Sequence, residues 1–214
     1  VSLQTEGIIP VDTYQVKILN FEDEIIAQEI VPINKMQVQI PVKNIHAWSA
    51  ESPTLYRCVV EMGEDSYETT FGFRTIRFDE NDLYINGQKV FLRGLNRHQC
   101  YPYIGYAAVD SLQEEDVRIL KKELHVNAVR TSHYPQSQLF IDACDRYGLY
   151  VFTEIPGWQH IGDETWKQQA IQNTKDMVLQ YRNHPSIILW GVRINESLDD
   201  DELYTKTNEI ARKL

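Results

Sequence analysis

The sequence predicts a multi-domain protein, an all-β sandwich followed by an α/β domain with the length of half a (β/α)8 barrel. In the first third of the 214 residues, apolar and polar side chains alternate along short segments separated by turn residues. From about residue 90 onward, strand patterns and helix patterns follow one another four times. Such alternation is typical of folds built from β-α units.

The first domain is expected to consist of short antiparallel strands. Period-2 alternation marks strands with one buried face, and about six such segments, without a helix pattern, occupy the first 75 residues. The clearest are residues 13–19, 36–40, 55–62 and 67–73, with turns at 20–24 and 63–65. Regularly spaced short strands predict a β-sandwich, and we place this domain at residues 1–77.

The second domain, residues 78–214, is expected to open with a β-hairpin, because Asn86-Gly87 lies between two apolar segments. Ser111 is a candidate N-cap for the first helix, and Gly148 is a candidate terminator for the second. The expected strands are 91–95, 126–129, 149–153 and 187–190, and the expected helices are 111–124, 136–147, 164–181 and 201–213. The first helix should bury Leu112, Val117, Leu120 and Leu124.

Four β-α units in this length correspond to half of a (β/α)8 barrel, which takes about 250 residues. The alternative is an open, doubly wound sheet. Because no glycine-rich phosphate loop follows any of the strands, the half-barrel is the favoured interpretation.

Composition limits the classes of partner. The formal charge is −10, from 31 acidic and 21 basic residues, which disfavours a nucleic-acid partner and is compatible with a neutral sugar. The longest apolar run, residues 186–190, is far shorter than the about 20 residues of a membrane span. Cys58, Cys100 and Cys144 form neither a disulfide framework nor a zinc pattern.

All four strand ends of the second domain carry polar side chains. Active residues of such folds follow the carboxyl ends of the strands, so we expect one polar pocket there. The candidates are Asn96, Arg97 and His98; Arg130 and His133; Glu154, Trp158 and His160; and Arg193, Asn195 and Glu196. Alternatives remain open: the histidines as core residues, Arg130 in an ion pair with Glu154, Trp158 as a packing residue, and Arg193 bound to Asp199 or Glu202.

Seven motifs occur in an order that strongly resembles family 2 glycoside hydrolases, particularly bacterial β-galactosidases. They are Phe71-Gly72-Phe73-Arg74, Ile85-Asn86-Gly87, Gly94-Leu95-Asn96-Arg97-His98, residues 127–135, Cys144-Asp145-Arg146-Tyr147-Gly148-Leu149, Arg182-Asn183-His184-Pro185-Ser186 and Asn195-Glu196-Ser197. The resemblance implies an immunoglobulin-like β-sandwich followed by the first four β-α units of a TIM barrel.

The resemblance also implies roles for the candidate residues. Glu196 is similar to the general acid/base, and Asn195 to the residue that contacts the sugar 2-hydroxyl. His98 and His133 match histidines of the sugar subsite, Arg130 matches an arginine beside the nucleophile, and Glu154 is expected to support the site. Trp158 suits the apolar face of a pyranose ring.

The implied activity is retaining hydrolysis of β-galactosides or related β-linked sugars; β-glucuronidase or β-mannosidase specificity, or a noncatalytic sugar-binding or assembly module, are the alternatives. Retention needs a second carboxylate as nucleophile, which the family carries on the seventh barrel strand, beyond this chain. No cofactor is required by this chemistry. His160 matches a magnesium-binding histidine of the galactosidases, but Trp158 stands where the family has a glutamate, so magnesium stays an alternative rather than a requirement, with His160 as a weak candidate ligand.

The chain begins with Val1 and lacks the basic and apolar regions of a signal peptide. We therefore expect a piece of a longer, bacterial-type protein, with no assignment between cytoplasm and periplasm. We further expect the isolated chain to be inactive, and to form a homodimer through the open edges of its half-barrel.

Overall fold

The computed structural model describes residues 1–5 and 11–214. The chain divides into two compact units, residues 1–48 with 54–73 and residues 49–53 with 74–214. None of the helices in the described ranges is both long and apolar enough to cross a membrane.

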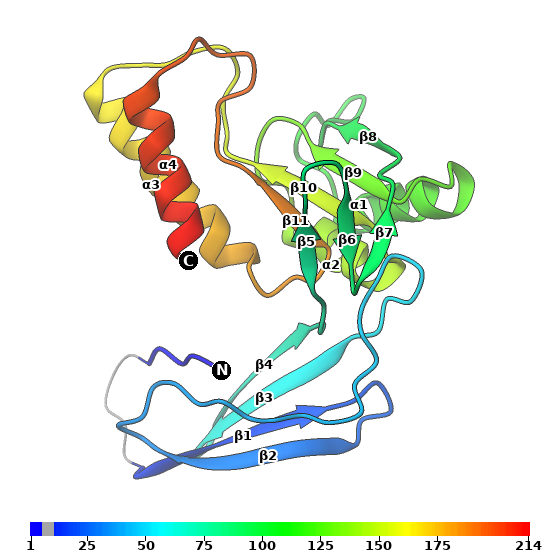
Figure 1. Ribbon diagram of the computed structural model, residues 1–214, viewed down its shortest axis with the longest axis vertical. Coiled ribbons are helices and arrows are strands. Elements are labelled where there is room, and N and C mark those ends of the chain that lie inside the picture. Colours follow the sequence, from blue (N-terminus) through cyan, green and yellow to red (C-terminus); the bar gives the residue numbers. More distant parts are fainter. Residues whose placement is uncertain (6–10) are drawn as a thin grey trace. The chain divides into compact units, whose positions relative to one another are not determined.

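The first unit contains a four-stranded antiparallel sheet in the order β2-β1-β3-β4 (Figure 1). Its strands are β1 (Thr13–Leu19), β2 (Ile25–Pro32), β3 (Tyr56–Met62) and β4 (Asp65–Phe71). Strands expected at 13–19, 55–62 and 67–73 are confirmed, with ends that differ by up to two residues. Strand β2 was not expected, because its apolar residues Ile25, Ile26 and Ile30 lack period 2 and remain exposed.

The strand expected at residues 36–40 is wrong. Val38 is buried, as its alternation indicates, but only an isolated bridge between Ser2 and Gln37 forms there. The N–H of Val38 donates to the carbonyl of Val1 at 2.9 Å. The segment that pairs with residues 36–40 is therefore the chain start, and its described part is too short to form a strand. The described part of this unit therefore has one regular sheet with four strands rather than about six strands in two sheets.

The second unit begins with a three-stranded antiparallel sheet made of β5 (Ile76–Phe78), β6 (Leu83–Ile85) and β7 (Gln88–Val90). The predicted hairpin is confirmed. Asn86 and Gly87 have φ values of 50° and 78°, which are the positive angles that a type I′ turn requires.

A parallel sheet with the order β11-β10-β9-β8 carries the strand ends of interest (Figure 1). Its strands are β8 (Gly94–Arg97), β9 (Ala128–Thr131), β10 (Tyr150–Glu154) and β11 (Ile187–Gly191). Strands β8 and β9 begin three and two residues later than expected. The outer strands are β8 and β11, so the two edges are those that the sequence predicted.

The helices are α1 (Asp110–Arg118), α2 (Gln138–Tyr147), α3 (Glu164–Tyr181) and α4 (Asp201–Lys213). The predicted bounds of α3 and α4 are confirmed, and Gly148 ends α2 with φ 76°. The predicted cap is wrong, because Ser111 lies inside α1 and Val109 occupies the N-cap. Leu124 is 52% exposed, because a π-helical turn at Ile119–Glu123 shifts it off the buried face.

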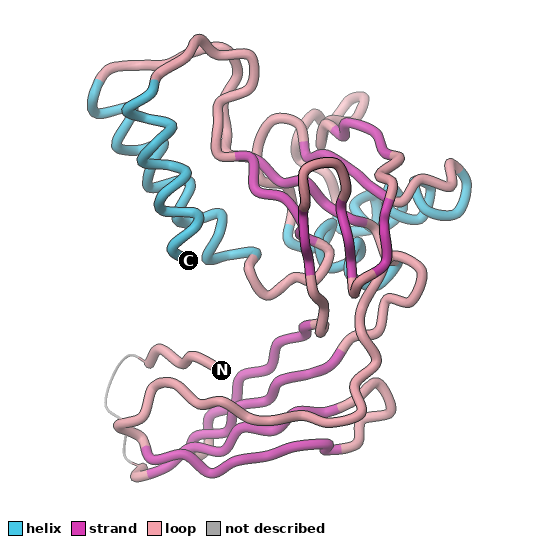
Figure 2. Tube along the Cα trace, in the orientation of Figure 1, coloured by secondary structure: helices cyan, strands magenta, loops and turns pink. Residues whose placement is uncertain are grey.

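Buried side chains from α1, α2, α3 and the parallel sheet form one core. Its members include Val117, Phe140, Ile141, Val129, Val151, Met177, Tyr181 and Ile187. Figures 1 and 2 show the loops after β10 and β11 running side by side. A parallel bridge between Trp158 and Asn195 joins these loops, which brings two groups of candidate residues together.

Candidate active site

The candidate residues follow the carboxyl ends of four parallel strands. His98 comes directly after β8, and Glu154 is the last residue of β10. Arg130 lies on β9 and His133 lies two residues beyond the end of that strand. Because the strands are parallel, these side chains share one edge of the sheet, as the sequence predicted.

Glu154 is the centre of a polar network at this edge. Its side chain is 3% exposed and accepts from Arg130 Nε at 3.0 Å and from Arg130 Nη2 at 2.8 Å. Its second oxygen lies 2.7 Å from Nδ1 of His133. Charge-assisted contacts from two sides satisfy a carboxylate that would otherwise be costly to bury. The ion pair between Arg130 and Glu154, one of the alternatives that the sequence left open, is therefore present.

The same guanidinium orients Asn195. Arg130 Nη2 donates to Oδ1 of Asn195 at 2.8 Å. Nδ2 of Asn195 is buried and has no hydrogen-bond partner among the described residues. An amide N–H₂ held in this way is a donor available to a ligand.

His98 and His133 face each other at the same edge. Their ring centroids lie 5.3 Å apart at an interplanar angle of 82°. His98 is exposed and His133 is partly exposed, so neither is a buried core histidine.

Glu196 lies in the loop after β11, in the left-handed region with φ 54°. One of its carboxylate oxygens accepts from Trp158 Nε1 at 3.0 Å and from Gln159 Nε2 at 2.9 Å. These two hydrogen bonds hold the pKa of the Glu196 carboxyl below its ordinary value, because they stabilise the charged form. Trp158 is 64% exposed, so its ring is not a packing residue within this unit.

Gln159 is a site residue that the sequence analysis missed. The available signal was its place directly after Trp158 in the loop that follows β10. Its N–H donates to the carbonyl of Asn195 at 2.8 Å. Gln159 therefore contacts both residues of the Asn195-Glu196 pair, once through its backbone and once through its side chain.

Arg193 does not join this group of residues. Its guanidinium donates to Asp199 at 2.5 Å and lies 4.9 Å from the centre of the Tyr204 ring. Of the alternatives that the sequence left open for Arg193, the salt bridge with Asp199 is the one that forms.

His160 belongs to no group of three metal-ligating side chains within the described residues. The His160 ring packs edge-on against Trp166, with centroids 5.7 Å apart, and magnesium prefers carboxylate oxygens. Within residues 1–5 and 11–214, the group with metal-ligand geometry is Asp142, Asp145 and His184. His184 precedes β11 and so lies at the opposite edge of the sheet, where its Nδ1 is 2.6 Å from Asp145.

Comparisons with known proteins fit this arrangement. A model described as "Glycosyl hydrolases family 2, TIM barrel domain" matches residues 76–213, and one described as "Glycosyl hydrolases family 2" matches residues 6–74. The chain belongs to glycosyl hydrolase family 2. The resemblance seen in the sequence motifs is thereby confirmed.

Two curated relatives are beta-galactosidases. The protein from Thermoanaerobacterium thermosulfurigenes is 54% identical over 177 residues, which are 81% of this chain and 25% of that protein. The protein from Thermoanaerobacter pseudethanolicus is 49% identical over 208 residues, 92% of this chain and 28% of that protein. The chain thus spans about a quarter of the length of these relatives.

Solved structures of the family agree in fold. An FMN-binding beta-glucuronidase from Facaelibacterium prausnitzii L2-6 superimposes with a TM-score of 0.88 at 28% identity, covering 95% of this chain and 34% of that one. Beta-glucuronidase 3 of Bacteroides uniformis gives 0.81 at 29% identity, covering 95% and 28%. The sheets and helices described above are consistent with part of the immunoglobulin-like and TIM-barrel domains of this family.

Proposed function

We propose that the full-length protein is a retaining β-glycosidase that hydrolyses β-galactosides, with Glu196 as its general acid/base. The Asn195-Glu196 pair beside the Arg130–Glu154 network is the observation that carries the proposal. Two beta-galactosidases share about half of their aligned residues with this chain, which supports β-galactosides as the substrate class. In this proposal, residues 1–77 form an immunoglobulin-like β-sandwich, and residues 78–214 form the first four β-α units of the TIM barrel.

The proposed chemistry needs two carboxyl groups on opposite sides of the glycosidic bond. In the first step Glu196 protonates the leaving oxygen while a nucleophilic carboxylate attacks the anomeric carbon. In the second step Glu196 removes a proton from the water that releases the sugar. The nucleophile is assigned to a carboxylate outside residues 1–214.

Glu196 needs a proton near neutral pH for the first step, yet the hydrogen bonds from Trp158 and Gln159 lower the pKa of its carboxyl. A second carboxylate at about 5–5.5 Å raises the pKa of its neighbour, because two like charges oppose each other's ionisation. In the full-length protein, the charge of the nucleophile is therefore expected to raise the pKa of Glu196. The two donors then stabilise the Glu196 carboxylate that forms once the proton has left.

The neighbouring residues suit recognition of a sugar. Nδ2 of Asn195 is the donor proposed for a hydroxyl next to the reacting carbon, since Arg130 already occupies its oxygen. His98 and His133 present ring nitrogens to further hydroxyls. Trp158 offers an exposed aromatic face with a polar edge, the combination that suits a pyranose. Glu154 holds Arg130 and His133 in place rather than touching the sugar.

The β-glucuronidases among the similar solved structures make β-glucuronides the main alternative substrate class. A panel of p-nitrophenyl β-glycosides, comprising galactoside, glucuronide and mannoside, assayed with the full-length protein separates these specificities. We expect the galactoside to give the highest kcat/KM. Hydrolysis of the glucuronide alone would contradict the galactoside assignment, and hydrolysis of none of the three would favour the noncatalytic module.

Two further measurements complete the test. The anomeric configuration of the first product, followed by NMR, should be β; an α product would rule out retention. Light scattering of purified residues 1–214 tests the predicted homodimer, and a strictly monomeric mass would contradict it.

A further inference from the structure

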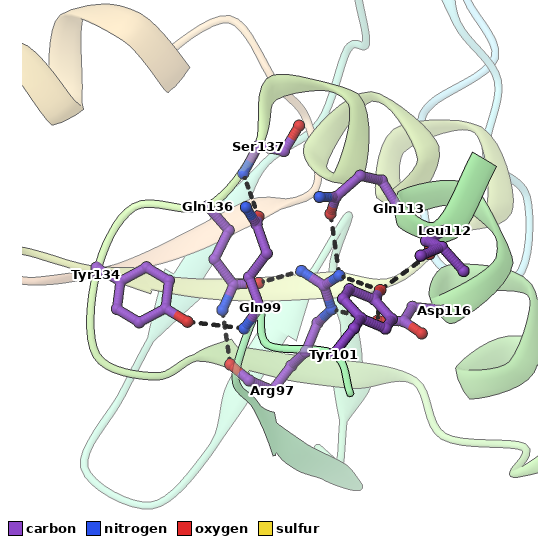
Figure 3. Close-up of polar contacts among 9 residues, drawn as sticks. All are labelled: Arg97, Gln99, Tyr101, Leu112, Gln113, Asp116, Tyr134, Gln136 and Ser137. Carbon is purple, nitrogen blue, oxygen red and sulfur yellow. Dashed lines mark hydrogen bonds and ion pairs between the residues drawn. The ribbon is translucent and has the colours of Figure 1, made fainter. Parts of the chain in front are cut away.

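Arg97, the last residue of β8, is buried with 7% exposure and is almost fully occupied by hydrogen bonds (Figure 3). Nε donates to Asp116 at 2.8 Å and Nη1 to Gln136 at 2.6 Å. Nη2 donates to Tyr101 at 3.0 Å and to Gln113 at 2.9 Å. A guanidinium with four partners in fixed directions is held in one position, which the point charge of a lysine cannot reproduce.

The network ties two loops together on either side of His133. The carbonyl oxygen of Arg97 accepts from the N–H of Ser132 at 3.0 Å and from Nε2 of Gln136 at 2.6 Å. Gln136 thus both donates to Arg97 and accepts from it. The backbone before and after His133 is therefore fixed to the residue that directly precedes His98.

A second cross-link lies beyond His98. The N–H of Gln99 donates to the Tyr134 hydroxyl at 2.7 Å, and Oε1 of Gln99 accepts from the N–H of Ser137 at 2.9 Å (Figure 3). His98 and His133 are each enclosed between cross-links from the other loop. Their edge-to-face contact at 5.3 Å joins two short stretches of fixed backbone.

Tyr101 provides hydrogen bonds in this network that do not depend on pH near neutrality. Its hydroxyl donates to Asp116 at 2.5 Å while it accepts from Arg97. Burial, followed by the hydrogen bond to Asp116, raises the pKa of Tyr101, so the hydroxyl keeps its proton across the working pH range. Asp116 in turn balances the charge of the buried guanidinium.

We propose that Arg97 is a positioning residue, which sets the geometry of the sugar-binding pair His98 and His133 by cross-linking the loops after β8 and β9. This inference rests on the proposed function. Arg97 itself does not touch the sugar. It acts through the two histidines. Loss of its guanidinium hydrogen bonds should therefore lower activity only to the extent that these histidines contribute to activity.

The test is a double-mutant cycle in the full-length protein with Arg97→Lys, His98→Ala and the double variant. Misplacement of binding groups by about 1 Å can cost roughly 100-fold, so Arg97→Lys should lower kcat/KM by about 10- to 100-fold and raise KM. Adding Arg97→Lys to His98→Ala should lower kcat/KM by a clearly smaller factor than adding it to wild type, because the part of the effect that passes through His98 is already lost and only the part that passes through His133 remains. Arg118→Lys on α1, an arginine paired with Glu115, is the matched control and should stay within about 2-fold of wild type.

Each outcome has a distinct meaning. Independent, multiplicative losses in the cycle, or a fall in kcat without a rise in KM, would show a merely structural role and overturn the inference. If Arg97→Lys does not fold, Gln136→Glu takes its place, since it keeps the acceptor for Arg97 and removes the donor to the Arg97 carbonyl. A wild-type protein that hydrolyses no β-glycoside overturns the proposed function, whereas an active wild type with a multiplicative cycle overturns this inference alone.

Discussion

Replacing Arg130 with methionine is expected to destabilise the second unit strongly, because it leaves the Glu154 carboxylate buried. Glu154 accepts two hydrogen bonds from Arg130 and one contact from His133, and its side chain is 3% exposed. After the substitution only His133 remains as a side-chain partner. Removing one member of a buried ion pair costs about 3–5 kcal/mol of unfolding free energy, because the other charge is left uncompensated.

The opposite substitution should cost less. Glu154→Gln leaves Arg130, whose side chain is 28% exposed, so water screens the charge that remains. We expect a loss of about 1–2 kcal/mol, the cost of weakened hydrogen bonds to a charged group. The double variant Arg130→Met with Glu154→Met should be more stable than Arg130→Met alone, because it removes the unpaired charge.

Denaturant titration of the full-length protein, followed by tryptophan fluorescence, gives these differences in free energy. Arg193→Met is the control, since Arg193 and Asp199 are 53% and 82% exposed although their atoms approach to 2.5 Å. An exposed pair contributes about 0–1 kcal/mol. A loss of unfolding free energy in Arg130→Met no larger than that in Arg193→Met would contradict this expectation. A double variant less stable than Arg130→Met would contradict it as well.

Two further predictions concern a turn and the acid/base. Gly148→Ala should destabilise the protein by more than about 2 kcal/mol, because φ is 76° and a Cβ would lie 2.4 Å from the carbonyl oxygen of Ala50. Gly87→Ala, with φ 78° and open space around it, should cost only about 1–2 kcal/mol; equal shifts in Tm would refute the steric argument. Trp158→Phe removes a donor that lowers the pKa of Glu196, so that pKa should rise. The acid then keeps its proton to higher pH, and the alkaline limb of the kcat/KM profile should move upward; a downward shift would contradict this.

Local patterns predicted the elements whose folding depends on nearby residues. The bounds of α3 and α4 and the hairpin at Asn86-Gly87 depend on helix periodicity, end residues and turn chemistry, all of which are visible within a few residues. Predictions failed where the backbone departed from regular geometry. Leu124 follows a π-helical turn that periodicity does not encode. Residues 36–40 have the pattern of a strand, but within the described part of the chain they form only one isolated bridge.

The same distinction holds at the candidate site. The rule that active residues follow strand ends brought Arg130, His133 and Glu154 to one edge of the sheet, as expected. The sequence left the contacts of Arg130 open, because its partners Glu154 and Asn195 lie 24 and 65 residues away. The Arg97 network was missed for the same reason, since its partner Gln136 is 39 residues distant.

The general acid role of Glu196 is tested most directly by the leaving-group dependence of Glu196→Gln in the full-length protein. A proton donor matters most for a poor leaving group, and general acid catalysis contributes about 10²–10⁴-fold. The variant should therefore hydrolyse lactose at least about 100-fold more slowly than wild type. Formation of the glycosyl-enzyme from 2,4-dinitrophenyl β-galactoside, which needs no proton donor, should be nearly unchanged. Equal losses for both substrates, or near wild-type hydrolysis of lactose, would contradict the account.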